Sequence, residues 1–362
     1  MDGIEIDFTP VGNESKAGDA ICFRYGNLEG SRDEQTVVVV DGGFKESGEA
    51  LVEHIKKYYK TENVDIVVST HPDQDHVNGL HVVLEELSVG ELWIHKAWDR
   101  SDLVAESKRL NWKSARVDDK YEGNFSAASD LVDLAESKAI PILEPFSGLR
   151  TTDEVVTVLS PTESYFEELM AELDSGKQSL AGSLAAELAN KISAAAEKLV
   201  GESHTIETLT DIGVTSNQNN SSVVLLIRFG DYATLLTGDA GMPPLEAVAD
   251  QLDELELSAG QLDFVQVPHH GSRKNVGPTV LNRILGSRKT EGAKTGSAFV
   301  SVPKSSDKHP AKKVMNAFRR RGYPVIGTEG SSKRWSRNAP DREGWSTADS
   351  YPHYSRVPED DG

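Results

Sequence analysis

Residues 69–80 read Ser69-Thr70-His71-Pro72-Asp73-Gln74-Asp75-His76-Val77-Asn78-Gly79-Leu80. The stretch follows a short apolar run, Ile66-Val67-Val68, which is typical of a buried strand. After it, apolar residues recur at helical spacing at Leu80, Val83, Leu84 and Leu87. We therefore expect this stretch to be a loop that joins a strand to a helix.

The loop carries four side chains of the kinds that bind metals, namely His71, Asp73, Asp75 and His76. Carboxylates held this close repel one another unless a cation lies between them. Imidazole nitrogen and carboxylate oxygen both suit zinc and manganese. The pattern favours a site for one or two divalent cations over the alternative, a polar loop that happens to be rich in Asp and His.

Three further acidic or imidazole groups follow other apolar runs. Asp41 comes after residues 37–40, Asp239 follows Thr237-Gly238 after the strand expected at 232–236, and the pair His269-His270 follows residues 264–267. Groups placed at the carboxyl ends of separate strands can converge on one edge of an α/β sheet. We expect them to join the loop at residues 71–76.

The pattern His-x-Asp-x-Asp-His resembles the metal-binding signature of the metallo-β-lactamase superfamily, usually His-x-His-x-Asp-His. Asp73 replaces the second histidine. That variant is most similar to the metallo-β-lactamase-like domain of bacterial competence (DNA-uptake) channel proteins and their free-standing relatives. The resemblance covers most of residues 4–328. It implies an α/β architecture, the four-layer αββα metallo-β-lactamase fold, with a helical insertion.

The resemblance also implies a role for each donor. His71 and Asp73 would bind a first metal, Asp75 and His76 a second, and Asp239 would bridge the two. Asp75 could also orient the attacking water.

One histidine of the pair at 269–270 would complete the second metal. We prefer His269, which is nearer the strand end, and assign His270 a catalytic or substrate-contacting role. Asp41 would steady the ligand loop by hydrogen bonding, with a cap on the following helix as the alternative.

The chain departs from the superfamily pattern between the loop and Asp239, where no histidine occurs in the usual Gly-His context. Instead residues 217–222 resemble the Asn-rich segment of the competence-type relatives, and Asn219 is a candidate substrate contact. Replacing an imidazole by a carboxylate favours harder ions, so manganese gains relative to zinc.

Further candidates lie on loops after the ligand strands. Ser272, Arg273 and Lys304 could contact a phosphate. His309, in Lys308-His309-Pro310, resembles the Gly-His-Pro element at the edge of the competence-type site, and we count it as a catalytic candidate.

Two bound cations can activate a water molecule and neutralise charge on a phosphoryl oxygen. We therefore expect a metal-dependent hydrolase, a phosphodiesterase or nuclease, with two zinc or manganese ions and a nucleic acid or nucleotide as substrate. The net charge of −20 argues against non-specific binding of long duplex DNA. Two alternatives remain open: hydrolysis of a small carboxylic ester, lactone or amide, and a non-catalytic module that binds a protein partner.

The elements expected along the chain alternate between strands and helices, as an α/β layered fold requires. Strands are expected at 4–8, after a turn within 18–23, and at 37–40, 65–69, 92–94, 155–159, 222–227, 232–236, 264–267, 298–302 and 324–327. Helices are expected around 50–58, 80–87, 100–110, 125–138, 165–173, 178–200, 243–254, 280–285 and 314–318.

We divide the chain into a domain at 1–330 and a polar tail at 331–362, to which we assign no secondary structure. A helical insertion at about 162–215 could cap the site or form an interface with a partner or a second copy, or be a plain surface hairpin. The longest aliphatic run, residues 223–227, is far too short to span a bilayer. With a single cysteine, Cys22, and no signal peptide, we expect a cytoplasmic protein without membrane contact.

Overall fold

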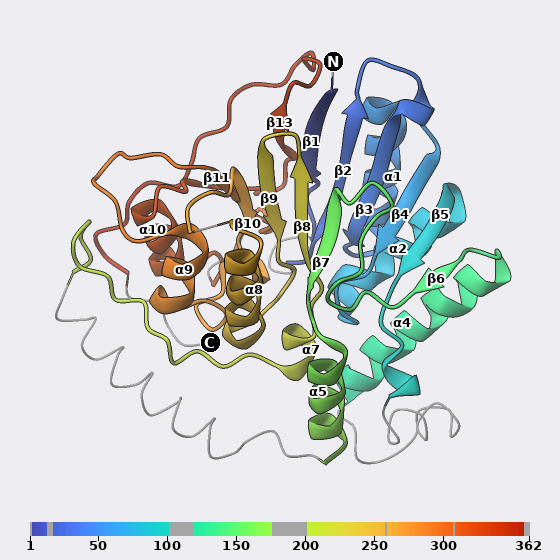
Figure 1. Ribbon diagram of the computed structural model, residues 1–362, viewed down its shortest axis with the longest axis horizontal. Helices are drawn as coiled ribbons and strands as arrows, with labels where there is room; N and C mark the ends of the chain where they lie inside the picture. Colours follow the sequence, from blue (N-terminus) through green and yellow to red (C-terminus); the bar gives the residue numbers. More distant parts are fainter. Residues whose placement is uncertain are drawn as a thin grey trace.

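The expected alternation of strands and helices builds two β-sheets that pack face to face (Figure 1). The structure is a computed structural model, and it describes residues 2–12, 17–100, 119–175, 201–257, 259–306 and 308–357. The helix expected at 178–200 lies outside the described residues, and so does the helix expected at 100–110 apart from its first residue. The central part of the expected insertion, residues 176–200, lies outside them as well.

The first sheet has seven strands in the order β13-β1-β2-β3-β4-β5-β6. Their bounds are β1 Asp2–Phe8, β2 Ala20–Asn27, β3 Gln35–Gly42, β4 Asn63–Val68, β5 Ser88–Trp93, β6 Ile142–Leu143 and β13 Lys333–Arg337. Neighbouring strands are antiparallel from β13 to β3 and parallel from β3 to β6.

The second sheet has six strands in the order β12-β11-β10-β9-β8-β7. Their bounds are β7 Val156–Ser160, β8 Val224–Phe229, β9 Tyr232–Leu236, β10 Phe264–Gln266, β11 Ser297–Val300 and β12 Val325–Gly327. Strands β9 to β12 are parallel, whereas β7, β8 and β9 form an antiparallel meander. In both sheets the parallel strands therefore send their carboxyl ends to a single edge.

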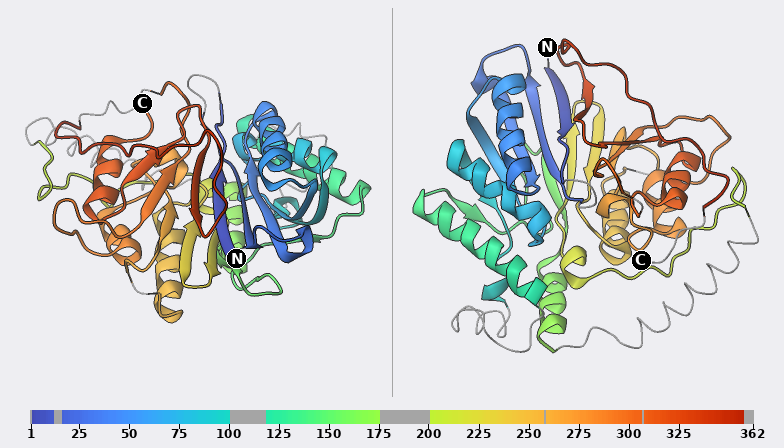
Figure 2. Two further views of the ribbon diagram at one scale, coloured as in Figure 1. Left: turned by 90° about the horizontal axis from the view of Figure 1, so that it is seen from above. Right: turned by 180° about the vertical axis from the view of Figure 1, so that it is seen from behind.

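Helices cover the outer face of each sheet, which completes the four-layer αββα arrangement (Figure 2). On the first sheet these are α1 Lys45–His54 (continued by the π-helical turn η2 Ile55–Tyr59), α2 Gln74–Glu86 and α4 Asp119–Ser137, with α5 Glu163–Ser175 at one end. On the second sheet they are α8 Met242–Glu254, α9 Pro278–Leu285 and α10 Lys312–Arg320. The expected fold class is confirmed.

Apolar side chains from both sheets fill the space between them. The inward-facing residues Ile4, Ile6 and Phe8 of β1 belong to one buried cluster with Phe264 and Phe299 of the second sheet. The rings of Phe8 and Phe264 lie 5.8 Å apart, edge to face. The alternation of apolar and acidic residues in β1 therefore fixes which face turns to the inter-sheet core.

The C-terminal segment differs from the expectation of a tail without regular structure. Residues 333–337 form β13, which pairs antiparallel with β1, and Trp335 is buried in the inter-sheet core. Arg334 contacts Glu5 of β1, and Arg342 reaches Asp7. The polar composition of this segment gave no sequence signal for an edge strand. Its arginines are needed to neutralise the acidic face of β1.

The ligand loop is shorter than expected because α2 begins already at Gln74. Asp73 is the residue before the helix, and Asp75 and His76 lie in its first turn. Two glycines allow this close approach of α2 to the end of β3. A Cβ added to Gly79 would lie 1.9 Å from the carbonyl oxygen of Gly42.

Candidate metal centre

The carboxyl ends of β4, β9 and β10 bring four histidines around one carboxylate oxygen, Oδ2 of Asp239. The nearest imidazole nitrogens lie 3.8 Å away for His71, 3.7 Å for His76, 3.6 Å for His269 and 3.9 Å for His270. These separations are too long for hydrogen bonds. They approach the spacing of about 3.3–3.4 Å between two donors on one tetrahedral zinc, whose bonds are about 2.0–2.1 Å long.

Hydrogen bonds on the far side of the rings orient two of these histidines. His76 Nδ1 donates to Asp41 Oδ2 over 2.7 Å, and His270 Nδ1 donates to the carbonyl oxygen of Ser301 over 3.1 Å. The proton on Nδ1 leaves a lone pair on Nε2, which is the arrangement found at metal-binding histidines. Both Nε2 atoms are buried, and neither makes a hydrogen bond within the described part of the chain.

His71 is held in the same way through a neighbouring hydroxyl. Thr70 Oγ1 donates its only proton to Asp41 Oδ2 over 2.6 Å. Because that proton is used, the contact of 2.9 Å between Thr70 Oγ1 and His71 Nδ1 requires Nδ1 to donate. His71 Nε2 is then the ring nitrogen with the lone pair, on the side of Asp239 and 4.0 Å from Asp73 Oδ2.

Asp41 lies behind this arrangement at the end of β3, with a backbone φ of 57°. Its carboxylate accepts hydrogen bonds from Thr70 N at 2.8 Å, from Thr70 Oγ1 and from His76. These bonds tie the ligand loop to β3. The structure thus places Asp41 where a residue that steadies the loop would lie.

Asp73 has a partner that the sequence did not indicate. Asn124 of α4 donates from Nδ2 to Asp73 Oδ1 over 2.8 Å, and to Gln218 Oε1 over 3.3 Å. Gln218 belongs to α7 Asn217–Asn220, the Asn-rich segment. Because α4 is distant in sequence and its polar residues resemble a solvated helix face, only the tertiary structure reveals this contact.

The structure favours His270 over His269 as a ligand, which reverses the preference drawn from the sequence. His270 is buried, and its ring nitrogen lies within 4.8 Å of donor atoms of Asp75 and His76. His269 is more exposed, and its Nδ1 lies 2.6 Å from Asn219 Nδ2, which can donate to it. The lone pair of that nitrogen is therefore already in use.

The backbone at this pair is held in an uncommon conformation. His269 has φ 46° and His270 has φ 54°, followed by Gly271 with φ 81°. The left-handed region is unfavourable for residues with a Cβ, and it persists where surrounding contacts require it. Here it turns both imidazoles toward Asp239 directly after β10.

Burial and mutual charge perturb the titration of these groups. Burial and the nearby carboxylates Asp19, Asp75 and Asp73 raise the pKa of Asp239 well above its usual range. Burial alone would lower the pKa of His76, but the charges of Asp239 and Asp41 raise it well above the ordinary value. Burial and the neighbouring imidazoles hold the pKa of His270 far below normal. Such opposed shifts in one cluster are typical of functional sites.

The candidates at the edge of the site fall into two groups. The His309 ring lies 6.2 Å from that of His269, and Asn219 contacts His269 directly, so both border the donors. Ser272 is buried one residue past the η4 turn (His269–Gly271), where its amide donates to the His269 carbonyl oxygen.

Lys304 lies against the C-terminal segment, where a Cβ added to Gly330 would be 3.3 Å from the Lys304 side chain. Arg273 follows Ser272 on the loop, and its neighbour Lys274 is close enough to His309 to lower the pKa of that imidazole, together with burial and Lys308.

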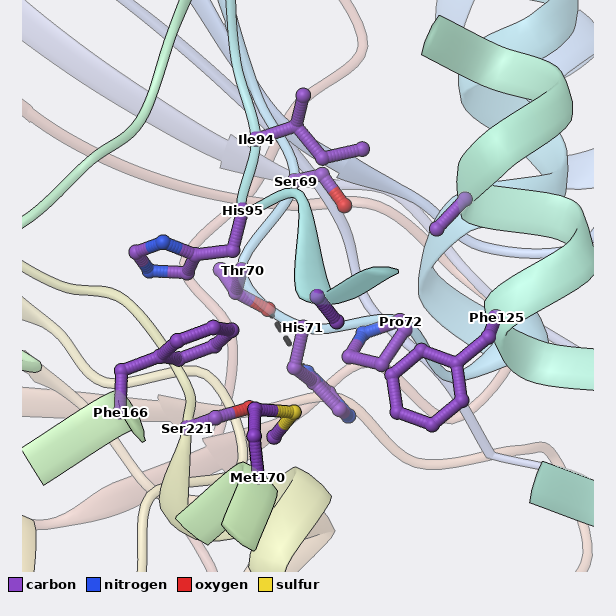
Figure 3. Close-up of a pocket in the computed structure, with 12 residues that line it drawn as sticks. Ser69, Thr70, His71, Pro72, Ile94, His95, Phe125, Phe166, Met170 and Ser221 are labelled. Carbon is purple, nitrogen blue, oxygen red and sulfur yellow. Dashed lines mark hydrogen bonds between the residues drawn. The ribbon is translucent and has the colours of Figure 1, made fainter. Parts of the chain in front are cut away.

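A small apolar cavity adjoins His71 (Figure 3). Its walls include Ile94, His95, Phe125, Phe166 and Met170. The volume is about 10 Å³, close to the space that one water molecule needs. His71 thus has mainly apolar neighbours on this side.

A buried carboxylate that the sequence analysis did not single out also lies at the centre. Asp19 directly precedes β2, and its carboxylate oxygen, a carboxylate oxygen of Asp239 and a ring nitrogen of His270 lie within 4.8 Å of one another. The sequence carries a signal that could have found it, since Gly18-Asp19-Ala20 repeats the tripeptide Gly238-Asp239-Ala240.

The donors fit divalent cations. Imidazole Nε2 atoms are prepared by hydrogen bonds on Nδ1, and the buried Asp239 Oδ1 makes no hydrogen bond within the described residues. A buried oxygen of a charged group without a partner is costly unless a cation binds it. His71 and Asp73 on one side, and Asp75, His76 and His270 on the other, would hold the ions about Asp239.

Comparison with known families agrees with this geometry. A family model described as the metallo-beta-lactamase superfamily matches residues 31–121, which include Asp41 and the whole ligand loop. Residues 31–121 are therefore similar to the metallo-β-lactamase superfamily. The superfamily signature thus coincides with the loop whose histidines surround Asp239, and the αββα layers continue the same fold beyond the matched residues.

Solved structures with this fold resemble the chain distantly. The metallo-beta-lactamase fold protein YhfI from Bacillus subtilis is 11% identical, with a TM-score of 0.40, and the match covers 92% of this chain and 100% of that one. Tm1679, a metal-dependent hydrolase of the beta-lactamase superfamily, is 13% identical, with a TM-score of 0.40 and coverage of 94% and 100%. A diphosphatase from the PhnP family is 10% identical, with a TM-score of 0.37 and coverage of 92% and 98%.

These likenesses are too distant to say anything about the substrate. A search of curated protein sequences gives no match to the chain. Within the described residues, no helix is long and apolar enough to cross a bilayer.

Proposed function

We propose that this protein is a metal-dependent hydrolase that cleaves phosphodiesters, with single-stranded nucleic acid or a nucleotide as the substrate class. The observation that carries the proposal is the gathering of ring nitrogens of His71, His76 and His270 at 3.7–3.9 Å from Asp239 Oδ2. Two divalent cations, manganese or zinc, would supply an activated water and neutralise charge on the phosphoryl group.

The protein's own residues hold and orient the reacting groups. Asp41, Thr70 and the Ser301 carbonyl fix the imidazoles, and Asn124 fixes Asp73. In our proposal Asp75, in the first turn of α2 beside His76 and His270, accepts a hydrogen bond from the attacking water and aligns it with the phosphorus. This alignment requires rigid donors, and the buried hydrogen bonds supply that rigidity.

The surroundings of His309 favour a phosphodiester over a neutral ester. Burial lowers the pKa of this imidazole, and the positive charges of Lys308 and Lys274 lower it further. The His309 ring in turn lies near that of His269 at the edge of the donors. A local cationic border on a chain of net charge −20 suits an anionic substrate that reaches the metals from this side.

Hydrolysis of a small carboxylic ester, lactone or amide is the alternative reaction, and turnover of an ester panel distinguishes it from phosphodiester cleavage. The third possibility, a non-catalytic module, gives no reason for so many prepared imidazoles in one place.

Within the superfamily, we propose that the chain is closest to the competence-type domain and its free-standing relatives. Three features support this: Asp73 in place of the second histidine, the Asn-rich α7, and the Lys308-His309-Pro310 element beside His269. The roles of His71, Asp73, Asp75, His76, Asp239 and His270 as ligands belong to the same proposal.

The proposal is tested with purified protein loaded with Mn²⁺ or Zn²⁺. The substrates are bis-p-nitrophenyl phosphate, single-stranded DNA, duplex DNA and a panel of p-nitrophenyl carboxylic esters. We expect phosphodiester turnover that the Asp75→Ala substitution lowers by about a thousandfold, the scale of a lost catalytic group. The matched control is Asp231→Ala, an exposed carboxylate in the turn between β8 and β9.

Turnover of esters alone would replace the phosphodiesterase proposal by the ester alternative. A protein that binds metal but turns over none of these substrates would contradict the proposed reaction.

A further inference from the structure

Asp19 is the least expected member of the metal centre. It directly precedes β2, a strand of the first sheet that carries none of the other donors. Asp19 is 1% exposed. A carboxylate oxygen of Asp19, a carboxylate oxygen of Asp239 and a ring nitrogen of His270 all lie within 4.8 Å of one another. Asp19 Oδ2 also lies 4.0 Å from His76 Nδ1.

Gln266 of β10 holds this carboxylate in place. Its Nε2 donates to Asp19 Oδ2 over 2.8 Å, while its Oε1 accepts from Thr237 N and Gly238 N at 2.8 Å and 3.1 Å. One buried side chain therefore fixes both Asp19 and the turn that carries Asp239. Gln266 thereby fixes the position of the Asp19 carboxylate relative to that of Asp239, although the two residues come from different sheets.

The other oxygen, Asp19 Oδ1, is buried and has no hydrogen-bond partner within the described residues. The Ser301 hydroxyl lies near the carboxylate, and within the described residues it too is buried without a partner. Asp239 Oδ1 is likewise buried without a hydrogen-bond partner within the described residues. Two buried carboxylates, each with an oxygen that has no donor, face the same small volume.

No lysine or arginine of the described residues pairs with these carboxylates. Their ion-pair partners within 4.0 Å in that part of the chain are imidazoles, and His76 lies near both of them. Buried charges cost several kcal/mol each, roughly, unless they are paired. One imidazole can offset only part of the charge of two carboxylates, and a divalent cation between them would offset the rest.

We propose that Asp19 is a direct ligand of the second cation, and that it shifts the preference of this site from zinc toward manganese. The inference rests on the proposed metal centre but not on the reaction assigned to it. With Asp19 the second cation has five protein donors, which are Asp19, Asp75, His76, Asp239 and His270. Three carboxylates and more than four ligands suit a hard ion with octahedral preference, whereas zinc prefers four ligands and more nitrogen.

The test measures metal binding without any substrate. Wild type and Asp19→Asn are stripped with chelator and titrated with Mn²⁺ and with Zn²⁺ against a chromophoric chelator. We expect wild type to bind two Mn²⁺. In Asp19→Asn we expect one Mn²⁺ affinity to fall at least tenfold, and the corresponding Zn²⁺ affinity to change by a smaller factor.

Asn is chosen because its amide oxygen can still accept the hydrogen bond from Gln266. The matched control is Asp65→Asn, which removes a carboxylate of β4 that accepts from Val37 N, away from the donors. Circular dichroism and thermal unfolding establish that both variants fold. An Asp19→Asn protein that binds two Mn²⁺ with wild-type affinities would overturn the inference.

A second measurement does not depend on any variant. In a crystal structure of the wild type soaked with Mn²⁺, anomalous scattering locates the ions. We expect an Asp19 oxygen within about 2.5 Å of one of them, as for an oxygen ligand of a hard cation. An ion bound by Asp75, His76 and His270 with Asp19 beyond hydrogen-bond distance would reject Asp19 as a ligand while leaving the proposed metal centre intact. Absence of any bound ion would reject both.

Discussion

Asp41 Oδ2 and His76 Nδ1 are joined by a hydrogen bond of 2.7 Å, deep behind the metal centre. Asp41 also accepts two hydrogen bonds from Thr70, whose hydroxyl in turn accepts from His71 Nδ1. One carboxylate therefore sets the orientation of both histidines of the ligand loop. Its position after β3 links the parallel part of the first sheet directly to the site.

We predict that Asp41→Asn weakens metal binding by about 10- to 100-fold, because an amide offers one acceptor atom where the carboxylate offers two. Asn also tolerates the left-handed backbone of this position, so the fold should persist. Competition with a chromophoric chelator measures the affinity, with Asp231→Asn as the control. Unchanged affinity in Asp41→Asn would show that the loop orients its histidines without this residue.

The contact between Asn124 and Asp73 makes a prediction for the first cation. Asn124→Ala removes the donor that holds Asp73 Oδ1, so we expect about a tenfold loss of affinity at one metal site and little change at the other. Asn63→Ala, at an exposed position at the start of β4, is the control. Isothermal titration with Mn²⁺ separates the two sites. Equal weakening of both sites would contradict the assignment of Asp73 to the first cation alone.

Metal removal should destabilise the protein, since the buried carboxylates then face one another without compensation. A cation at a hundred times its Kd stabilises the folded state by about 2.7 kcal/mol. We expect chelator to lower the Tm by several degrees, as scanning calorimetry measures. Asp239→Asn should abolish the metal-dependent increase and raise the Tm of the metal-free protein, because it removes one of the repelling charges. A metal-free Asp239→Asn protein less stable than metal-free wild type would contradict this account.

A separate buried group of Asp7, Cys22 and His54 has metal-type donors within 4.8 Å of one another, but its carboxylate is already neutralised. Both guanidinium nitrogens of Arg342 bind Asp7, at 2.7 Å and 2.8 Å. Burial alone would raise the pKa of Asp7, but the hydrogen bonds of His54 and Arg342 lower it from 3.8 to about 2. This group therefore ties the C-terminal segment to β1 and α1 rather than binding a metal.

The lowered pKa of Asp7 predicts a specific acid sensitivity. The folded state holds the ionised form more tightly than the unfolded chain, so Asp7 contributes stability that is complete above about pH 4 and is lost as the pH falls toward 2. The shift corresponds to about 2 kcal/mol. Urea unfolding of wild type and Asp7→Asn between pH 6 and pH 2.5 should show the difference between them shrinking toward acid pH. A constant difference across that range would contradict the lowered pKa.

The sequence alone determined the ligand loop, the strand ends that carry Asp41, Asp239 and the pair His269-His270, and the α/β class, while the αββα layers followed from the family resemblance. The first three are local signals: apolar runs of strand length, helical spacing of leucines, and acidic or imidazole residues placed directly after a strand. Parallel strands then bring their carboxyl ends together for geometric reasons, so the convergence at Asp239 could be expected before any coordinates.

The tertiary structure showed a difference between two adjacent histidines that both face Asp239: the ring of His269 contacts Asn219, whereas Nε2 of His270 is buried without a hydrogen-bond partner in the described residues. It also brought in Asn124 and Asp19, whose surroundings come from elements far apart in the chain. The same holds for β13, since a strand rich in arginine becomes favourable only when the acidic face of β1 lies beside it. Local pattern sets where a donor can be, whereas burial and long-range hydrogen bonds set what it can bind.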